Sequence, residues 1–148
     1  MQHLQYPVHV NAPIEHVWAF ALDTSRWPDW QPRSEYVDFS GPLDQAGTTY
    51  VQRWRMMGHE MTANCNVVEV VPQRLYHEHS DMGPMETVIR FEPEGDGTLV
   101  SFEFDYEMPG HLPKVIESLV SKGWVERQTT QMLDDFKAVA EATVPVAV

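Results

Sequence analysis

The stretch His77-Glu78-His79 is the one part of the sequence that suggests a metal site. Side chains two positions apart on a strand face the same way, so both imidazoles could bind one ion, with His59 as a third ligand from a neighbouring turn. In the alternative orientation the histidines face solvent, and Tyr76, Glu78 and Ser80 point inward. The pattern favours solvent-facing histidines, and we predict no metal and no cofactor.

A second group of polar residues alternates with aromatic ones between Tyr50 and Arg55. Arg53 and Arg55 share one strand face, and if they pointed inward they could hold a carboxylate or a phenolate. We favour the opposite orientation, with both arginines in solvent. Tyr50, Gln52 and Trp54 would then line the interior and supply a hydroxyl group and an amide.

Polar residues also interrupt the apolar face of a long helix expected from Pro113 to about Thr143. Glu126 and Arg127 lie in this interruption. A buried carboxyl group there could transfer a proton, whereas on a solvated helix face both side chains would simply be hydrated. We favour hydration. Cys65 has no basic neighbour in the sequence, so we expect a small buried side chain rather than a nucleophile.

Composition and charge exclude several classes of protein. The chain has 148 residues, with 22 acidic against 10 basic side chains and a net charge of -12. Such a charge disfavours nucleic acid and anionic membrane as partners. The sequence contains one cysteine, no signal peptide and no apolar run long enough to span a bilayer, so we expect no membrane insertion and a cytoplasmic location.

The pattern of elements predicts one domain over residues 1–148. Tyr6 to Val10 alternates as a strand, Pro13 opens a helix, and Asp23 or Thr24 caps a second short helix. Strands and turns follow as far as Met108, ahead of the long helix. Four further strands are expected from their alternation, at 48–57, 60–71, 75–80 and 85–91, and the clearest one spans 98–108. Consecutive hairpins indicate an antiparallel sheet whose apolar face needs a cover.

Four short motifs carry a resemblance to a known superfamily. They are Ala12-Pro13-Ile14-Glu15-His16-Val17-Trp18, Trp27-Pro28-Asp29-Trp30, Val70-Val71-Pro72 and Gly95-Asp96-Gly97-Thr98. In these motifs the chain resembles the SRPBCC (START-like) superfamily, in its polyketide cyclase/dehydrase-type branch. The resemblance implies an α+β helix-grip fold of order β-α-α-β6-α. In that fold about seven strands form a curved antiparallel sheet around a long C-terminal helix.

The resemblance also implies a ligand cavity between the sheet and the helix. We therefore predict binding of a small hydrophobic or aromatic ligand. The candidate ligand-binding residues are Tyr50, Trp54, Met61, His77, Met85, Phe91, Phe102, Phe104, Tyr106 and Arg127.

Two alternatives to plain ligand binding stay open at this point. One is an enzyme like polyketide cyclases or dehydratases, in which His77, His79, Tyr106 or Glu126 would have to act. Its catalytic residues are not assigned. The other is a protein-interaction module, as in other branches of the superfamily. The sequence does not determine the oligomeric state.

Overall fold

The computed structural model describes residues 2–31, 34–56, 58–81, 85–106 and 122–145. Its elements are β1 (Gln2–Val10), α1 (Ile14–Leu22), the 3-10 helix η1 (Thr24–Asp29), β2 (Glu35–Val37), β3 (Thr49–Met56), β4 (His59–Val71), β5 (Leu75–Ser80), β6 (Met85–Glu94), β7 (Gly97–Tyr106) and α3 (Lys122–Ala142). The start predicted for the long helix, at Pro113, lies outside the described residues.

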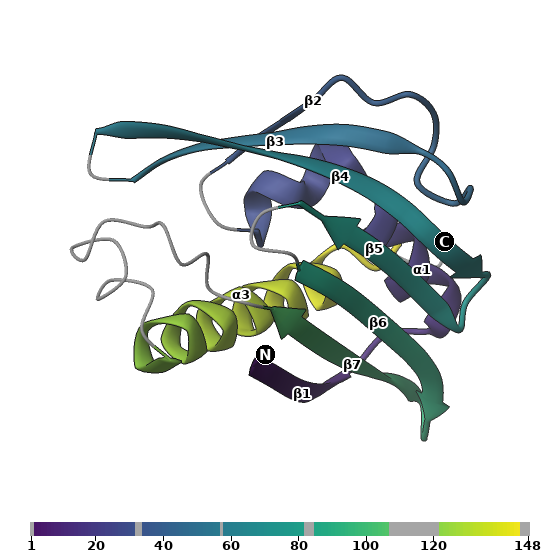
Figure 1. Cartoon of the computed structure of the whole chain (residues 1–148). Helices are drawn as coiled ribbons and strands as arrows, with labels where there is room; N and C mark the ends of the chain where they lie inside the picture. Colours follow the sequence, from purple (N-terminus) through teal and green to yellow (C-terminus); the bar gives the residue numbers. More distant parts are fainter. Residues whose placement is uncertain (1, 32–33, 57, 82–84, 107–121, 146–148) are drawn as a thin grey trace.

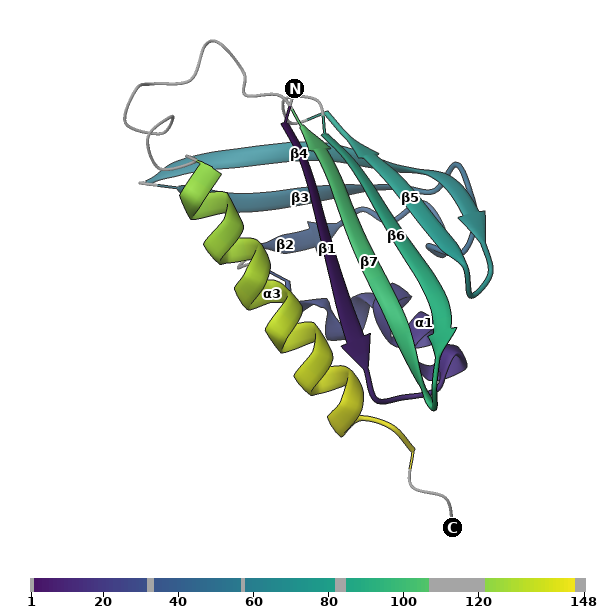
Figure 2. The ribbon, with the colours of Figure 1, turned by 90° about the horizontal axis from the view of Figure 1, so that it is seen from below.

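All strands belong to one antiparallel sheet of order β1-β7-β6-β5-β4-β3-β2. Figures 1 and 2 show a strongly curved sheet, with α3 running along β1 inside the curve and α1 and η1 closing one end. This is the α+β helix-grip arrangement that the sequence predicts. The two short helices fall where Pro13 and Asp23 indicate, and the Asp23 carboxylate caps η1 by accepting from the Ser25 backbone N–H at 3.0 Å.

The register decides which side chains face α3. One row crosses the sheet from Tyr50 through Cys65, Ser80 and Met85 to Tyr106, because these residues are opposite one another on successive strands. Successive side chains on a strand alternate between faces. The concave side of the sheet, which we call the inner face, therefore carries the residues of this row, and Arg53 and Arg55 lie on the outer face, exposed, as expected.

An aromatic cluster seals one part of the inner face. Phe136 of α3 is fully buried and packs edge-on against Trp30 and Phe102, with ring centroids 4.9 and 5.3 Å away. Phe20 of α1 completes the cluster, 5.2 Å from Phe136. Burying each such ring contributes about 1.5–3 kcal/mol, so this cluster fixes the helices on the sheet.

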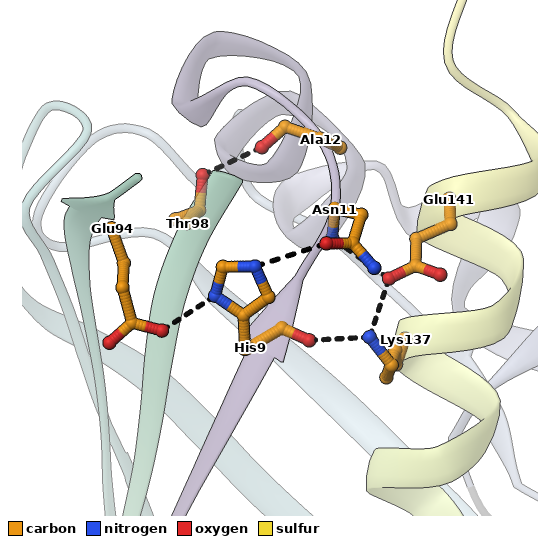
Figure 3. Close-up of polar contacts among 7 residues, drawn as sticks. All are labelled: His9, Asn11, Ala12, Glu94, Thr98, Lys137 and Glu141. Carbon is orange, nitrogen blue, oxygen red and sulfur yellow. Dashed lines mark hydrogen bonds and ion pairs between the residues drawn. The ribbon is translucent and has the colours of Figure 1, made fainter. Parts of the chain in front are cut away.

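A polar network holds the end of α3 against β1 (Figure 3). The Lys137 ammonium group donates to the His9 carbonyl oxygen at 2.7 Å and to Oε2 of Glu141 at 2.6 Å. The same Glu141 oxygen accepts the Asn11 backbone N–H at 2.8 Å, while the His9 ring lies 2.6 Å from a carboxylate oxygen of Glu94. The network therefore links α3, β1 and the β6–β7 hairpin through charge-assisted contacts.

Gly97 allows β1 to approach this hairpin closely. A Cβ atom at Gly97 would collide with the Val10 carbonyl oxygen and lie 2.9 Å from two atoms of the His9 ring. The neighbouring Thr98 is fully buried and donates from its hydroxyl group to the Ala12 carbonyl oxygen at 2.9 Å. The tight turn motif in the sequence thus also sets the spacing between β1 and β7.

Candidate functional site

Glu78 is the acidic group at the centre of the inner face. It lies opposite Val67 and Thr87, which are both buried on that face. Its Oε2 accepts two hydrogen bonds, from the Tyr50 hydroxyl at 2.6 Å and from the Tyr76 hydroxyl at 3.0 Å. Both tyrosines are buried, whereas Glu78 keeps part of its surface exposed. The arrangement is a carboxyl group held by two phenols, in a residue that is itself only partly buried.

Burial dominates the electrostatics of this cluster. It raises the pKa of Glu78 above the ordinary value of 4.5, although the hydrogen bonds from Tyr50 and Tyr76 and the charge of His77 act in the opposite direction. Burial and then the charge of Glu78 raise the pKa of both tyrosines, which therefore stay protonated and act as donors.

Cys65 lies beside the cluster and has no nucleophilic character. Burial, followed by the charge of Glu78, raises the pKa of its thiol to about 11. A thiol with such a pKa is almost entirely protonated at neutral pH, and nucleophilic attack requires the thiolate. The side chain is buried in the core, as the sequence indicates.

A second acidic group lies at the edge of the same face. Tyr6 of β1 and Tyr106 of β7 both face inward, and burial followed by the charge of Glu126 raises the pKa of each phenol. Glu126 of α3 is half-buried, whereas Arg127 and Thr130 beside it are exposed. The hydration expected for Glu126 is thus only partial.

Most of the predicted ligand-binding residues gather on the inner face. Tyr50, Phe91 and Phe102 are buried within the core. Five others keep part of their surface exposed on the same face: Trp54, Met61, Met85, Phe104 and Tyr106. The sheet therefore presents large apolar side chains next to Glu78 that the packing does not fully cover.

Two predicted site residues lie elsewhere. His77 is on the outer face, where its Nε2 is 2.7 Å from one oxygen of Glu86, while His79 Nδ1 is 2.8 Å from the other oxygen. Arg127 is exposed on α3. The strand orientation is thus the alternative one, with Tyr76, Glu78 and Ser80 inward, and the structure brings neither His77 nor Arg127 to the inner face.

Two surface hollows are found on the described part of the chain, and the first of them also touches Tyr50 and Cys65 beside Glu78. One, of about 330 Å³, is lined mainly by outer-face residues of β3, β4 and β5 such as Thr49, Asn64 and His79. The other, of about 620 Å³, follows the Gly123 to Asp134 side of α3. Among the described residues, no three His, Cys, Asp or Glu side chains gather as a metal-binding group, and no described helix is long and apolar enough to cross a membrane.

Comparison with known proteins identifies the family. A family model described as "Polyketide cyclase / dehydrase and lipid transport" matches residues 1–141. The chain belongs to this family. The resemblance inferred from the sequence is thereby confirmed. No curated protein matches the chain at a significant level.

Solved structures of low sequence identity share the fold of this member of the polyketide cyclase/dehydrase and lipid transport family. TTHA0849 from Thermus thermophilus superposes with a TM-score of 0.77 at 18% identity, over 97% of this chain and 100% of that one. CV1439 from Chromobacterium violaceum gives a TM-score of 0.67 at 21% identity, covering 95% and 99% of the two chains. The di-domain ARO/CYC StfQ from the steffimycin biosynthetic pathway gives 0.69 at 14% identity, over 95% of this chain and 51% of that one.

Sequence reasoning missed one polar group on this polyketide cyclase/dehydrase-type scaffold. The indole N–H of Trp30 is buried and finds no acceptor among the described residues. An unsatisfied buried donor costs about 1–3 kcal/mol, so this N–H is a position where a water molecule or a ligand oxygen would be stabilised. The Trp-Pro-Asp-Trp motif locates Trp30 in the sequence, but nothing in the motif distinguishes its N–H from that of Trp27, which donates to the Ala21 carbonyl oxygen at 2.9 Å.

Proposed function

We propose that this chain binds a small hydrophobic or aromatic ligand between the inner face of the sheet and α3. The strongest support for this site is that side-chain burial differs from one part of the inner face to another. Around Phe102 and Phe136 it is fully sealed, whereas Trp54, Met61 and Phe104 keep part of their apolar surface exposed. Apolar side chains that stay partly exposed beside a few convergent polar groups are typical of ligand sites.

The polar groups on the same face suit orientation of the ligand. Glu78 with its two tyrosines lies inside the apolar area, and Tyr106 with Glu126 lies at its edge. A few such groups within apolar surroundings fix the direction in which a ligand enters, while the apolar contacts supply most of the affinity.

A pair of substitutions on one strand tests this site. Met85 lies on the inner face of β6 and Val88 on its outer face, opposite His77 and Glu103. With the neutral dye Nile red as probe, we expect Met85→Trp to fill the site and weaken binding at least about tenfold, while Val88→Trp leaves it unchanged. Native mass spectrometry of gently purified protein would show whether a ligand copurifies. Equal effects of both substitutions would contradict an inner-face site.

Glu78 also favours a second candidate function, that of a polyketide cyclase or dehydratase. Burial raises the pKa of its carboxyl group, and a carboxyl group that titrates nearer neutrality is suited to general acid–base catalysis. Confinement on the apolar face would supply the orientation that ring closure of a flexible polyketone requires. Incubation with a synthetic linear polyketone thioester, followed by mass spectrometry and chromatography, would detect cyclised or dehydrated product. Product formation that survives Glu78→Gln would remove Glu78 from this mechanism.

The interaction-module alternative gains little support. The large hydrophobic side chains that the described residues expose most are Val68 and Val71, each 43% exposed, near the end of β4. Two separated valines form a much smaller apolar area than protein interfaces use.

A further inference from the structure

We propose that the polar part of the ligand is a hydrogen-bond donor, a hydroxyl or an amino group, that binds Oε1 of Glu78, and that long-chain carboxylates are rejected. This inference rests on the proposed ligand site of the inner face. It adds the chemical class of the ligand, which neither the family nor the fold specifies.

The tyrosines determine which oxygen of Glu78 a ligand can use. Both hydroxyl groups donate to Oε2, one from β3 and one from β5. Oε1 is therefore the oxygen that a further donor can reach without displacing a tyrosine. Because the carboxyl group is already held in one orientation, a ligand does not have to order it on binding.

Residue burial singles out Glu78 within the cluster. Tyr50 is 4% exposed and Tyr76 is 2% exposed, so their hydroxyl groups are closed to a ligand, whereas Glu78 is only partly covered. A ligand on the inner face near Phe104 would lie close to Glu78, because Glu78, Thr87 and Phe104 are opposite one another on successive strands. In its ionised form the Glu78 carboxylate accepts hydrogen bonds and does not donate them, so the ligand group that binds this form must be a donor.

The distribution of basic residues argues against an anionic ligand. Arg53, Arg55 and Arg90 lie on the outer face, and Arg90 Nε donates to Oε2 of Glu103 at 2.8 Å. Lys137 is committed to His9 and Glu141 at the β1 edge. Arg26, Arg74 and Arg127 are exposed, so none of the Arg and Lys side chains that the structure describes is buried on the inner face.

The acidic side chains near the inner face also disfavour an anionic ligand. Glu78 and Glu126 both act on inward-facing tyrosines. A carboxylate head group would meet these charges without a cation to balance it, and like charges brought together in a partly desolvated site repel strongly. An ammonium group would be attracted there, and a hydroxyl group would be tolerated.

A series of probes with one chain length tests the inference at neutral pH. Dodecan-1-ol, dodecylamine, dodecan-2-one and dodecanoic acid differ in the head group, and displacement of Nile red gives the affinity of each. We expect the alcohol and the amine to bind at least about tenfold more tightly than the acid, because a hydrogen bond to a charged group is among the stronger ones. The ketone should rank below the alcohol.

Substitutions then assign the preference to Glu78. Glu78→Gln should reduce the advantage of the amine and the alcohol over the acid at least about fivefold, whereas Glu69→Gln, with the same loss of charge on the exposed outer face of β4, should leave it unchanged. Glu78→Asp keeps the charge and withdraws the carboxylate, and we expect it to lower the affinity of the alcohol as well. Melting curves show whether each variant is folded. If Glu78→Gln does not fold, Glu78→Asp provides the test.

The outcomes separate this inference from the function on which it rests. Binding of Nile red together with a preference for the acid or the ketone would overturn the inference and leave the ligand site standing. Retention of the full preference in Glu78→Gln and Glu78→Asp would overturn the role of Glu78. No binding of Nile red or of any probe would overturn both the site and the inference.

Discussion

The Tyr50 hydroxyl donates to Oε2 of Glu78 across an intervening strand, at 2.6 Å. Tyr50 belongs to β3 and Glu78 to β5, and Cys65 of β4 lies between them. The contact therefore joins strands that share no backbone hydrogen bonds with each other. It ties β3 to β5 at the point where the inner face carries its central acid.

Removal of this hydroxyl group should destabilise the fold. We expect Tyr50→Phe to lower the free energy of unfolding by about 1.5–3 kcal/mol, because the acceptor is a carboxylate that burial already disfavours. Tyr36→Phe is the matched control, since its hydroxyl donates to the neutral Gln31 amide at 3.1 Å and should cost only about 0.5–1.5 kcal/mol. Urea denaturation measures both. A smaller loss for Tyr50→Phe than for Tyr36→Phe would contradict the importance of the Glu78 contact.

The raised pKa of Glu78 predicts a stability that depends on pH. Between the ordinary value of 4.5 and the higher folded value, the folded protein binds more protons at this site than the unfolded chain. Stability therefore falls as pH rises through that window. Glu78→Gln removes the effect, so the variant should gain stability relative to the native protein as pH rises from about 4 to about 8. Urea denaturation at several pH values would show this, and a constant difference would argue against it.

Glu141 should show the opposite pH dependence. The Asn11 backbone N–H, followed by the Lys137 ammonium group, lowers the pKa of its carboxyl group. The stabilisation is present above 4.5, the ordinary pKa, and is lost as pH falls through the lower folded value. Glu141→Gln should therefore be less stable than the native protein at neutral pH and should approach it in acid. Thermal melting across this pH range is the measurement, and a gap that widens in acid would contradict it.

Two glycine substitutions should change stability in opposite directions. Gly97→Ala forces a Cβ atom into the Val10 carbonyl oxygen and should cost about 1–3 kcal/mol. Gly123→Ala places a Cβ atom in α3 whose nearest neighbour is an Arg127 nitrogen at 3.8 Å, and should stabilise by about 1 kcal/mol. Chemical denaturation of both variants tests the pair. If both substitutions changed stability equally, β1 and the β6–β7 hairpin would be able to move apart at Gly97.

His77 should not contribute to ligand binding. Its ring lies on the outer face beside Glu86, on the other side of the sheet from the proposed ligand. We expect His77→Gln to change the dissociation constant of Nile red by less than about twofold, as is usual for surface residues without shared contacts. Fluorescence titration measures it. A large loss of affinity would restore the sequence-based prediction for His77.

Most elements of the fold, though not the three-residue strand β2, could be predicted because each has a local cause. Alternation from Thr98 to Tyr106 identifies a strand with one apolar face, and Pro13 and Asp23 mark helix starts by their backbone chemistry. The family motifs coincide with these turns and helix starts. For this reason they predict the scaffold well and its chemistry poorly.

The Glu78 cluster depends on register, which local pattern does not determine. His77 and Glu78 are equally polar neighbours, and only the pairing with β4 decides which one faces α3. A register shift between Val67 and Glu69 complicates the orientation further, because an extra residue there changes which positions of β4 point inward. Tyr50 was expected on the inner face. Its contact with Glu78, however, can be predicted only when the relative positions of β3, β4 and β5 are known.

The pairing of β1 with β7 has a consequence for the synthesis of this protein. Gln2 lies opposite Tyr106 and Val10 opposite Thr98, so the first strand has no partner until β7 has been translated. Closing so long a loop is slow, and an unpaired strand edge can meanwhile join another chain. A nascent chain that stalls before β7 leaves the ribosome would therefore expose β1 to aggregation.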